Sequence, residues 1–211
     1  ELRKGKSPQR WSVPRPGHAD LPGMIRYGFD DAAPVTERSS ARSTAAVTAA
    51  GACAKALLAK FGISVYSHVP MVAGIMAEEI PLTVAGLKKI MGSKVLRCLD
   101  VTAEKAMVKA IEEAMEEGIT LGGEFEVAAF GLPAGLGTYV HPDRRLDAAL
   151  SADVMAIPAV KAVSIGRGLE VAHIDGQHAH DEIFPADGMP PGARPSLGGK
   201  PTPGSGFVRT T

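Results

Sequence analysis

Glycine and proline place the strongest limits on how this chain can fold. The sequence contains 24 glycines and 16 prolines among 211 residues, well above the average usage of about 12% for the two together. Glycine adopts backbone angles that other residues avoid, whereas proline fixes φ and has no N–H group, so both interrupt helices and strands. Aromatic residues make up only 5% of the chain. We therefore expect many turns and shaped loops around an aliphatic core.

Charge and composition exclude several classes of protein. The 23 basic and 23 acidic side chains give a formal net charge of zero, so no overall basic field would attract nucleic acid or an anionic membrane. No uninterrupted apolar run reaches the roughly 18 residues of a membrane span, and the polar N-terminus predicts no secretory signal. Cys53 and Cys98 lie in Ala-rich and apolar segments, which favours buried free thiols in a soluble cytoplasmic protein.

Four segments have the apolar spacing and terminal residues of helices. The Ala-rich helix should begin near Ser39 or Ser40, since serine is a good N-cap, and should stop at Gly62. In the segment 102–118, Thr102 is the expected N-cap, and the expected apolar face consists of Ala106, Ala110, Ile111 and Ala114. The other helices are expected over 83–91 and over 143–157, where Pro158 interrupts or ends the helix.

Alternating residues predict strands over 63–75 and 119–133, with a bulge or a close backbone approach at Gly122 and Gly123. A hairpin is expected over 160–174, turning at 166–168. Extended chain and turns are expected over 1–37, and a long Gly- and Pro-rich loop over 175–206. This order predicts an α+β or layered α/β fold with a mainly antiparallel sheet, in a single domain spanning residues 1–211.

One histidine lies in the turn-forming stretch RPGHAD at residues 15–20. Pro16 fixes φ and Gly17 allows a sharp bend, so a stiff loop can present the imidazole of His18. Asp20 is placed to orient or charge that ring. The alternative is a surface histidine with no special role, which is the commoner case for a histidine in such a loop.

The stretch ERSSAR at residues 37–42 suggests an anion site. Ser39 and Ser40 precede the Ala-rich helix, and Arg38 and Arg42 flank them. Free N–H groups at a helix start, two hydroxyls and two guanidinium groups would together suit a phosphate. A capped helix with solvated arginines explains the same residues equally well.

Two other polar segments are better explained without a ligand. Residues 131–147 match no phosphate-binding fingerprint, so a strand-to-helix connection capped by Asp143 is favoured, although Arg144 and Arg145 are placed to face an anion. Residues 173–182 contain three His, two Asp and a Glu, but their spacing matches no known ligand pattern. We therefore predict a polar loop edge and no metal.

Several stretches, in this order and at this spacing, resemble chorismate synthase: RPGHAD, YGFDD, ERSSARSTAA, GITLGGEFEVAAFGLPAGLGTYVHPDRRLDAAL, AIPAVKAVSIG and HAHDEI. The resemblance runs from about residue 13 to the C-terminus. It implies an α+β fold of the layered β-α-β sandwich type, with packed helices, and a homotetramer. It also implies a lyase of the shikimate pathway, which forms chorismate from 5-enolpyruvylshikimate 3-phosphate by anti-1,4 elimination of phosphate and requires reduced FMN.

The resemblance also implies roles for individual residues. His18 matches the active-site histidine that protonates reduced FMN, a role suited to imidazole because its charge changes near neutral pH. Arg38, Ser39 and Ser40 match FMN contacts, and Ser40 with Arg42 matches positions near the substrate. Ala159 matches a further flavin contact. These assignments include no metal ligand.

The sequence departs from the family pattern in places. Ser43 stands where a glutamate is usual, and Pro158 replaces an amide residue that touches flavin, which removes a side-chain amide and a backbone N–H. Family motifs that precede and follow the matched part are not in the sequence. We therefore expect the core of a longer chorismate synthase, unable to turn over alone. The alternative is a non-catalytic relative that keeps the scaffold for binding flavin or phosphate, or for assembly.

Overall fold

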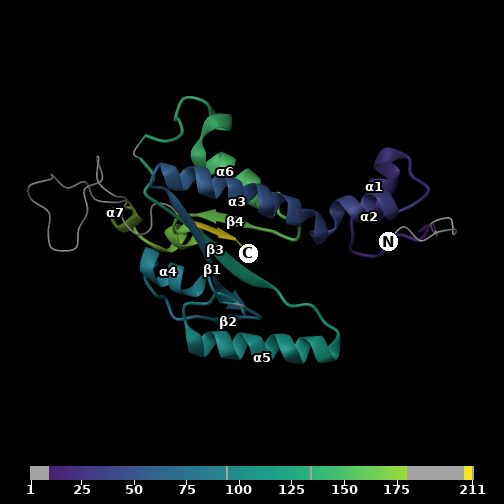
Figure 1. Cartoon of the computed structure of the whole chain (residues 1–211), viewed down its shortest axis with the longest axis horizontal. Helices are drawn as coiled ribbons and strands as arrows, with labels where there is room; N and C mark the ends of the chain where they lie inside the picture. Colours follow the sequence, from purple (N-terminus) through teal and green to yellow (C-terminus); the bar gives the residue numbers. More distant parts are fainter. Residues whose placement is uncertain (1–9, 94, 134, 180–206, 211) are drawn as a thin grey trace, which may run out of the picture. The chain divides into compact units, whose positions relative to one another are not determined.

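The structure is a computed structural model that describes residues 10–93, 95–133, 135–179 and 207–210. The chain divides into two compact units, Glu1–Ala54 and Lys55–Thr211. The first unit is helical and the second contains the sheet (Figure 1). The single domain expected over residues 1–211 stays a prediction, because two compact units can fold either together or apart. Within the described ranges, no helix combines the length and apolar character needed to cross a membrane.

Two short helices of the first unit, α1 (Asp20–Tyr27) and α2 (Ala33–Ser39), lie in the segment for which extended chain and turns are predicted. That prediction is wrong for residues 20–27 and 33–37. The reason is that glycine and proline mark helix ends here. Gly28, with φ of 67°, ends α1 by donating its N–H to the Met24 carbonyl, and Pro34 lies in the first turn of α2. Both are positions where these residues favour a helix boundary.

Helices α1 and α2 pack closely at Gly23. A Cβ at Gly23 would lie 2.4 Å from Cγ1 of Val35, so glycine is required for this approach. Asp31 connects α2 to the chain that precedes α1, since its Oδ1 accepts the N–H of Trp11 at 3.0 Å and that of Ala33 at 2.9 Å. These contacts give the helical unit a defined internal packing.

The Ala-rich helix is confirmed. A 3-10 turn, η1 (Ala41–Ser43), leads into α3 (Thr44–Lys60), and Gly62 follows with φ of 76°. Ser40 is the cap of this helical segment, because its Oγ accepts the N–H of Arg42 at 3.2 Å. Both cysteines are free thiols, and Cys98 is buried as predicted. The predicted burial of Cys53 is wrong, because Cys53 lies on α3, which buries none of its residues in the part of the chain described.

The second unit contains one antiparallel sheet with strand order β2-β1-β3-β5-β4. The strands are β1 (Ser64–Val72), β2 (Ile75–Met76), β3 (Gly123–Phe130), β4 (Val163–Ile165) and β5 (Phe207–Thr210). The predicted α+β fold with a mainly antiparallel sheet is confirmed, as are the strands expected in 63–75 and 119–133. Figure 1 shows α5 beside β2 and α6 beside β4, the sheet edges that they contact.

One turn, one close backbone contact and one register shift shape the β1 end of the sheet. Ala73 and Gly74 join β1 to β2 with φ of 55° and 76°, and two positive values in a two-residue loop define a type I′ turn. The close approach predicted at 122–123 is confirmed, since a Cβ at Gly123 would lie 2.8 Å from the carbonyl oxygen of Met71. The pairing of β1 with β3 also shifts in register between His68 and Met71.

The hairpin predicted over 160–174 is wrong. The chain turns at Gly166 and Gly168, whose φ values are 61° and 53°, but it then enters a 3-10 helix, η3 (Gly168–His173), instead of a second strand. Strand β4 pairs with β5. Of the loop predicted over 175–206, residues 176–179 form the short helix α7 (Gly176–Ala179), and residues 180–206 lie outside the described residues.

Helices α4 (Val84–Ile90), α5 (Val101–Glu117) and α6 (Leu146–Met155) confirm three predicted helices. The predicted N-cap of α5, Thr102, is wrong. Asp100 is the cap, and its carboxylate accepts the N–H groups of Thr102 and Ala103 at 2.8 and 3.1 Å. The buried face is rotated accordingly: of the predicted apolar residues Ala114 is buried, but the others buried on α5 are Ala103 and Met107. Ala103 and Met107 form a core cluster with Cys98.

Candidate functional site

The loop at residues 15–20 is closed by a salt bridge between its two ends. The guanidinium of Arg15 donates from Nε to Oδ2 of Asp20 at 2.8 Å and from Nη2 to Oδ1 at 2.9 Å, and the Arg15 backbone N–H donates to Oδ2 at 3.0 Å. Asp20 is 1% exposed. A bidentate pair of this kind fixes geometry as well as charge. The loop that carries His18 is therefore held at both ends by one carboxylate.

The ring of His18 contacts the backbone of its own loop. The expectation that Asp20 orients this ring by direct contact is wrong, because the Asp20 carboxylate is engaged by Arg15. Instead, Nδ1 of His18 lies 2.9 Å from the carbonyl oxygen of Pro16. A carbonyl only accepts hydrogen bonds, so Nδ1 carries the hydrogen and Nε2 is left to face a ligand. His18 is exposed, and Gly17 makes the bend with φ of 71°.

Hydrogen bonds from Arg15 hold the pKa of Asp20 well below its usual range. They outweigh the opposing effect of burial, and the charge of Arg15 and the hydroxyl of Thr36 act in the same direction as these bonds. The same pairing raises the pKa of Arg15. Asp20 is therefore ionised throughout the neutral range.

The basic segment, residues 38–42, comprises the end of α2, Ser40 and the start of η1. Ser39 is the last residue of α2 and donates its hydroxyl to the Val35 carbonyl at 2.8 Å. Ser40 has extended backbone and caps η1. The N–H groups expected to be free for an anion are mostly engaged, since those of residues 42, 43 and 44 have acceptors in Ser40 and in the carbonyls of residues 40, 41 and 42. Any capacity for anions therefore lies mainly in side chains.

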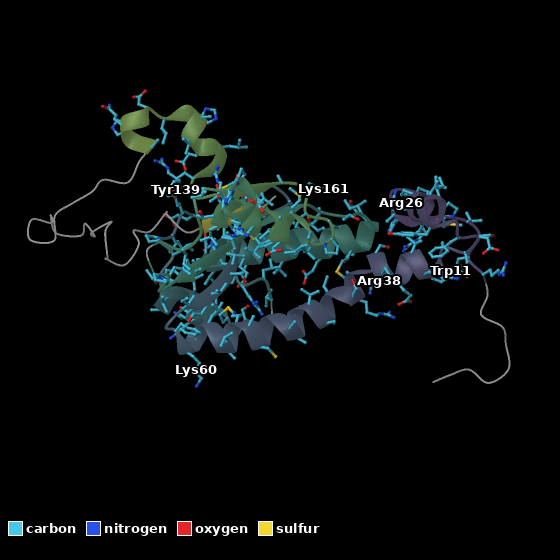
Figure 2. All side chains as sticks on the ribbon, turned by 90° about the horizontal axis from the view of Figure 1, so that it is seen from above. Trp11, Arg26, Arg38, Lys60, Tyr139 and Lys161 are labelled. Atoms are coloured by element: carbon cyan, nitrogen blue, oxygen red, sulfur yellow. The ribbon has the colours of Figure 1, made fainter. Side chains whose placement is uncertain are left out.

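Arg38 and Arg42 supply that capacity. Both are exposed, and neither has an acidic partner in the described part of the chain. Figure 2 labels Arg38 on α2 and Arg26 on α1, another arginine without such a partner. Unpaired guanidinium groups present rigid forks of donors that match phosphate and carboxylate groups. The chemistry of the basic segment is thus that of an anion site.

Thr36 connects the His18 loop to the helix that leads into the basic segment. Its hydroxyl donates to Oδ1 of Asp20 at 3.3 Å and accepts from Nη2 of Arg15 at 3.4 Å. Thr36 lies on α2, two positions before Arg38 in the sequence. Through Thr36, the loop is therefore hydrogen-bonded to the helix that carries Arg38.

Ala159 lies in a tight turn of the second unit. The N–H of Val160 donates to the Ile157 carbonyl at 3.2 Å, and Ala159 has φ of 71°. A proline at the second position and a positive φ at the third define a type II turn, in which the third residue is usually glycine. Pro158 thus ends the helical stretch as predicted and presets this turn. Ala159 is exposed and held in the left-handed region.

The remaining polar segments are engaged in local contacts. Arg145 forms a salt bridge with Asp147, so its guanidinium already has an acidic partner. The predicted cap Asp143 is wrong, because it lies in η2 (Pro142–Arg144) and α6 has no side-chain cap. Among the described residues, no group of three or more His, Cys, Asp or Glu side chains could hold a metal ion.

Sequence reasoning missed the pair His68 and Glu126. Nε2 of His68 donates to Oε2 of Glu126 at 2.7 Å across β1 and β3, and each residue is only 7% exposed. Nδ1 of His68 has no hydrogen-bond partner in the described structure. The sequence contains one signal for this pair, because each predicted strand carries a titratable residue at a position that points inward. The sequence analysis also did not predict that Asp20 closes the loop by a salt bridge, although Arg15 and Asp20 stand at the two ends of this short loop.

Fold and site first define a class: an α+β protein with an antiparallel sheet, and with exposed arginines suited to a phosphorylated ligand. The family model described as chorismate synthase matches residues 3–200, and the chain belongs to this family. A crystal structure of chorismate synthase superposes with a TM-score of 0.78 at 34% sequence identity, covering 91% of this chain and 61% of that one. This match confirms the predicted fold class and the resemblance.

Curated relatives agree with the family. Over 179 residues the chain is 51% identical to a chorismate synthase of Carboxydothermus hydrogenoformans, covering 84% of this chain and 46% of the relative. Over 183 residues it is 49% identical to a chorismate synthase of Streptomyces coelicolor, covering 86% and 45%. The chain therefore spans about half the length of the curated relatives it matches.

Proposed function

We propose that this chain carries part of the active site of a chorismate synthase, which eliminates phosphate from 5-enolpyruvylshikimate 3-phosphate to give chorismate with reduced FMN. The observation that supports this most is the pair of exposed guanidinium groups of Arg38 and Arg42 in the same unit as His18. The substrate and the flavin both carry phosphate groups. Cationic forks without a competing carboxylate are the groups expected to bind them.

The residues present fit the flavin at one of the two predicted contacts. Arg38 offers donors for a phosphate, and the hydroxyls of Ser39 and Ser40 keep lone pairs or protons for further contacts. At the second contact, Pro158 brings neither an amide side chain nor an N–H, so only the exposed backbone and methyl group of Ala159 face a ligand there. When bound, reduced FMN would supply the transient electron that the elimination requires.

The remaining chemistry belongs to residues of the chain. Arg42 and Ser40 would orient the substrate by its anionic groups, which lowers the entropic cost of reaction. His18 would hold a proton at Nε2, the nitrogen that its backbone contact leaves available. Such proton transfer by a positioned imidazole contributes about 10²- to 10⁴-fold to rates in enzymes.

The test is an anaerobic titration of the full natural chain with reduced FMN, with and without 5-enolpyruvylshikimate 3-phosphate, followed by a phosphate-release assay. Arg38→Gln and Arg42→Gln should each raise a Kd, for flavin or for substrate, by about tenfold or more, equivalent to about 1.4 kcal/mol. Arg26→Gln is the matched control, because Arg26 is an exposed arginine of the same unit outside the basic segment. Equal losses in all three variants would contradict the proposal.

The same titration distinguishes the alternative role. A full chain that binds reduced FMN but releases no phosphate would favour a non-catalytic relative of the family. We further propose a homotetramer in the cytoplasm, without nucleic acid or membrane partners, as the resemblance and the charge balance suggest. Sedimentation of the full natural chain tests the assembly, and a mass other than that of four chains would contradict it.

A further inference from the structure

Asp20 is the charged residue in the first unit with the least exposure among those described, at 1%. Its carboxylate accepts four hydrogen bonds: three come from the side chain and backbone of Arg15, and one comes from Thr36. Both oxygens are used. A buried carboxylate with this number of donors fixes the groups around it, because releasing any of them leaves a desolvated charge without its partner.

The orientation of His18 depends on this fixed loop. Its Nδ1 hydrogen bond runs to the carbonyl of Pro16, the residue that follows Arg15. The acceptor is therefore part of the segment that Asp20 closes. If the ends of the loop separate, that carbonyl moves, and with it the direction in which Nε2 points.

The same carboxylate also reaches the second functional element. Thr36 lies on α2, and its hydroxyl binds Oδ1 of Asp20. Asp20 is itself the first residue of α1, and α1 and α2 pack without space at Gly23 and Val35. The position of the His18 loop relative to α2, which continues into Arg38, is thus set through Asp20.

We propose that Asp20 is a positioning residue that holds His18 in place relative to the basic segment, so that Nε2 is aligned for proton transfer. The role rests on the function proposed above for His18 and the basic segment. Asp20 acts through Arg15, Pro16 and Thr36, and it does not touch the reacting atoms.

The experiment compares Asp20→Asn with the unaltered full natural chain. Asparagine keeps the size of the side chain but loses the charge and one acceptor oxygen. We expect faster amide hydrogen exchange over residues 15–20, measured by mass spectrometry without flavin or substrate. We also expect kcat per flavin-bound site to fall by about 10- to 100-fold, the loss typical of a misplacement of about 1 Å. KM and flavin stoichiometry should change less than about threefold, because the groups that bind stay in place.

This division of effects separates positioning from folding. A merely structural role would lower flavin stoichiometry and leave kcat per flavin-bound site unchanged, and that result would overturn the proposal. Unchanged hydrogen exchange would overturn it as well. Asp30→Asn is the matched control, because Asp30 forms an exposed ion pair with Arg10 in the same unit. An equal fall in kcat for Asp30→Asn would show a general effect of charge and contradict a specific one.

Thr36→Val provides a second variant in case Asp20→Asn folds poorly. It removes one of the four hydrogen bonds to Asp20 and preserves the shape of the side chain. A smaller fall in kcat per flavin-bound site, again without a change in KM, supports the proposal, and no fall contradicts it. If the unaltered chain releases no phosphate, the proposed function fails. The exchange measurement then still decides whether Asp20 closes the loop.

Discussion

His68 and Glu126 form a buried cross-strand pair, with Nε2 2.7 Å from Oε2 at a position where β1 and β3 are in register. Removing one partner of a buried hydrogen bond costs about 1 to 3 kcal/mol in other proteins, because the remaining polar group stays desolvated. The stability of the sheet should therefore depend on this pair.

We predict that His68→Leu lowers the free energy of unfolding by about 1 to 3 kcal/mol, since Glu126 loses its hydrogen bond from Nε2. Urea denaturation of the full natural chain measures the change. Lys109→Ala is the control, because Lys109 forms an exposed ion pair with Glu113 and should cost less than about 1 kcal/mol. Equal effects of the two substitutions would contradict a special role of the buried pair.

The contact between Gly23 and Val35 predicts a second outcome. Gly23→Ala should destabilise the chain by about 1 to 3 kcal/mol, because the added methyl group would overlap Cγ1 of Val35. Adding Val35→Ala should recover part of this loss, and a double-mutant cycle measures the coupling. Gly51→Ala serves as control. Its Cβ would meet no atom within 4 Å, and the gain in helix propensity should stabilise α3 by up to about 1 kcal/mol.

The left-handed residues predict stabilising substitutions. Ala73→Asn should raise the free energy of unfolding by about 0.5 to 1 kcal/mol, because asparagine suits the first central position of a type I′ turn better than alanine does. Thermal unfolding measures the shift. An unchanged or lower melting temperature would contradict the strain inferred at Ala73, whose φ is 55°.

Ala159→Gly tests the turn that follows Pro158. Glycine has no Cβ penalty at the third position of a type II turn, so we expect a gain in the free energy of unfolding of up to about 1 kcal/mol. If the turn also contacts flavin, the Kd for reduced FMN should rise slightly, because glycine leaves the turn less rigid. A loss of stability would show that alanine relieves a different constraint at this position.

The lowered pKa of Asp20 predicts a pH dependence of stability. A carboxyl group whose folded-state pKa lies below its unfolded value of about 3.9 contributes stability above that pH, and the contribution is lost as the pH falls through the folded value. We therefore expect Asp20→Asn to be less stable than the unaltered chain at pH 7. The difference should shrink steadily below about pH 4. Urea denaturation at several pH values measures this, and a difference independent of pH would contradict it.

Sequence reasoning identified most of the second unit, because its elements follow simple periodicities. The strand around His68, the strand after Gly123 and the helix ending at Gly118 all appear near their predicted places. The prediction is wrong in the first unit, where glycine and proline can mark either a turn or the end of a helix. The glycines and prolines of residues 1–37 predict turns, yet Gly28 and Pro34 mark helix ends, and the same composition supports either structure until tertiary contacts decide.

The candidate site, too, is predictable from the sequence only in part. The motifs around His18 and Arg38 are visible in the sequence as rigid and cationic segments, and the roles of these residues stay predictions. The partner of Asp20 could not be found from local spacing alone. A carboxylate two positions from a histidine looks like its partner, but Arg15 offers two parallel hydrogen bonds and therefore binds it more strongly.

The place of β5 in the sheet has a consequence for folding during synthesis. Strand β5 lies between β3 and β4, and Val208 pairs with both Val127 and Ile165. While the ribosome is still translating the preceding residues, the edge of β3 that pairs with β5 is open, and β4 lacks the strand with which it pairs in the described structure. Pairing between segments so distant in sequence is slow, because a long loop must close first. The nascent chain therefore exposes a β-edge that can pair with the wrong strand until β5 has been made.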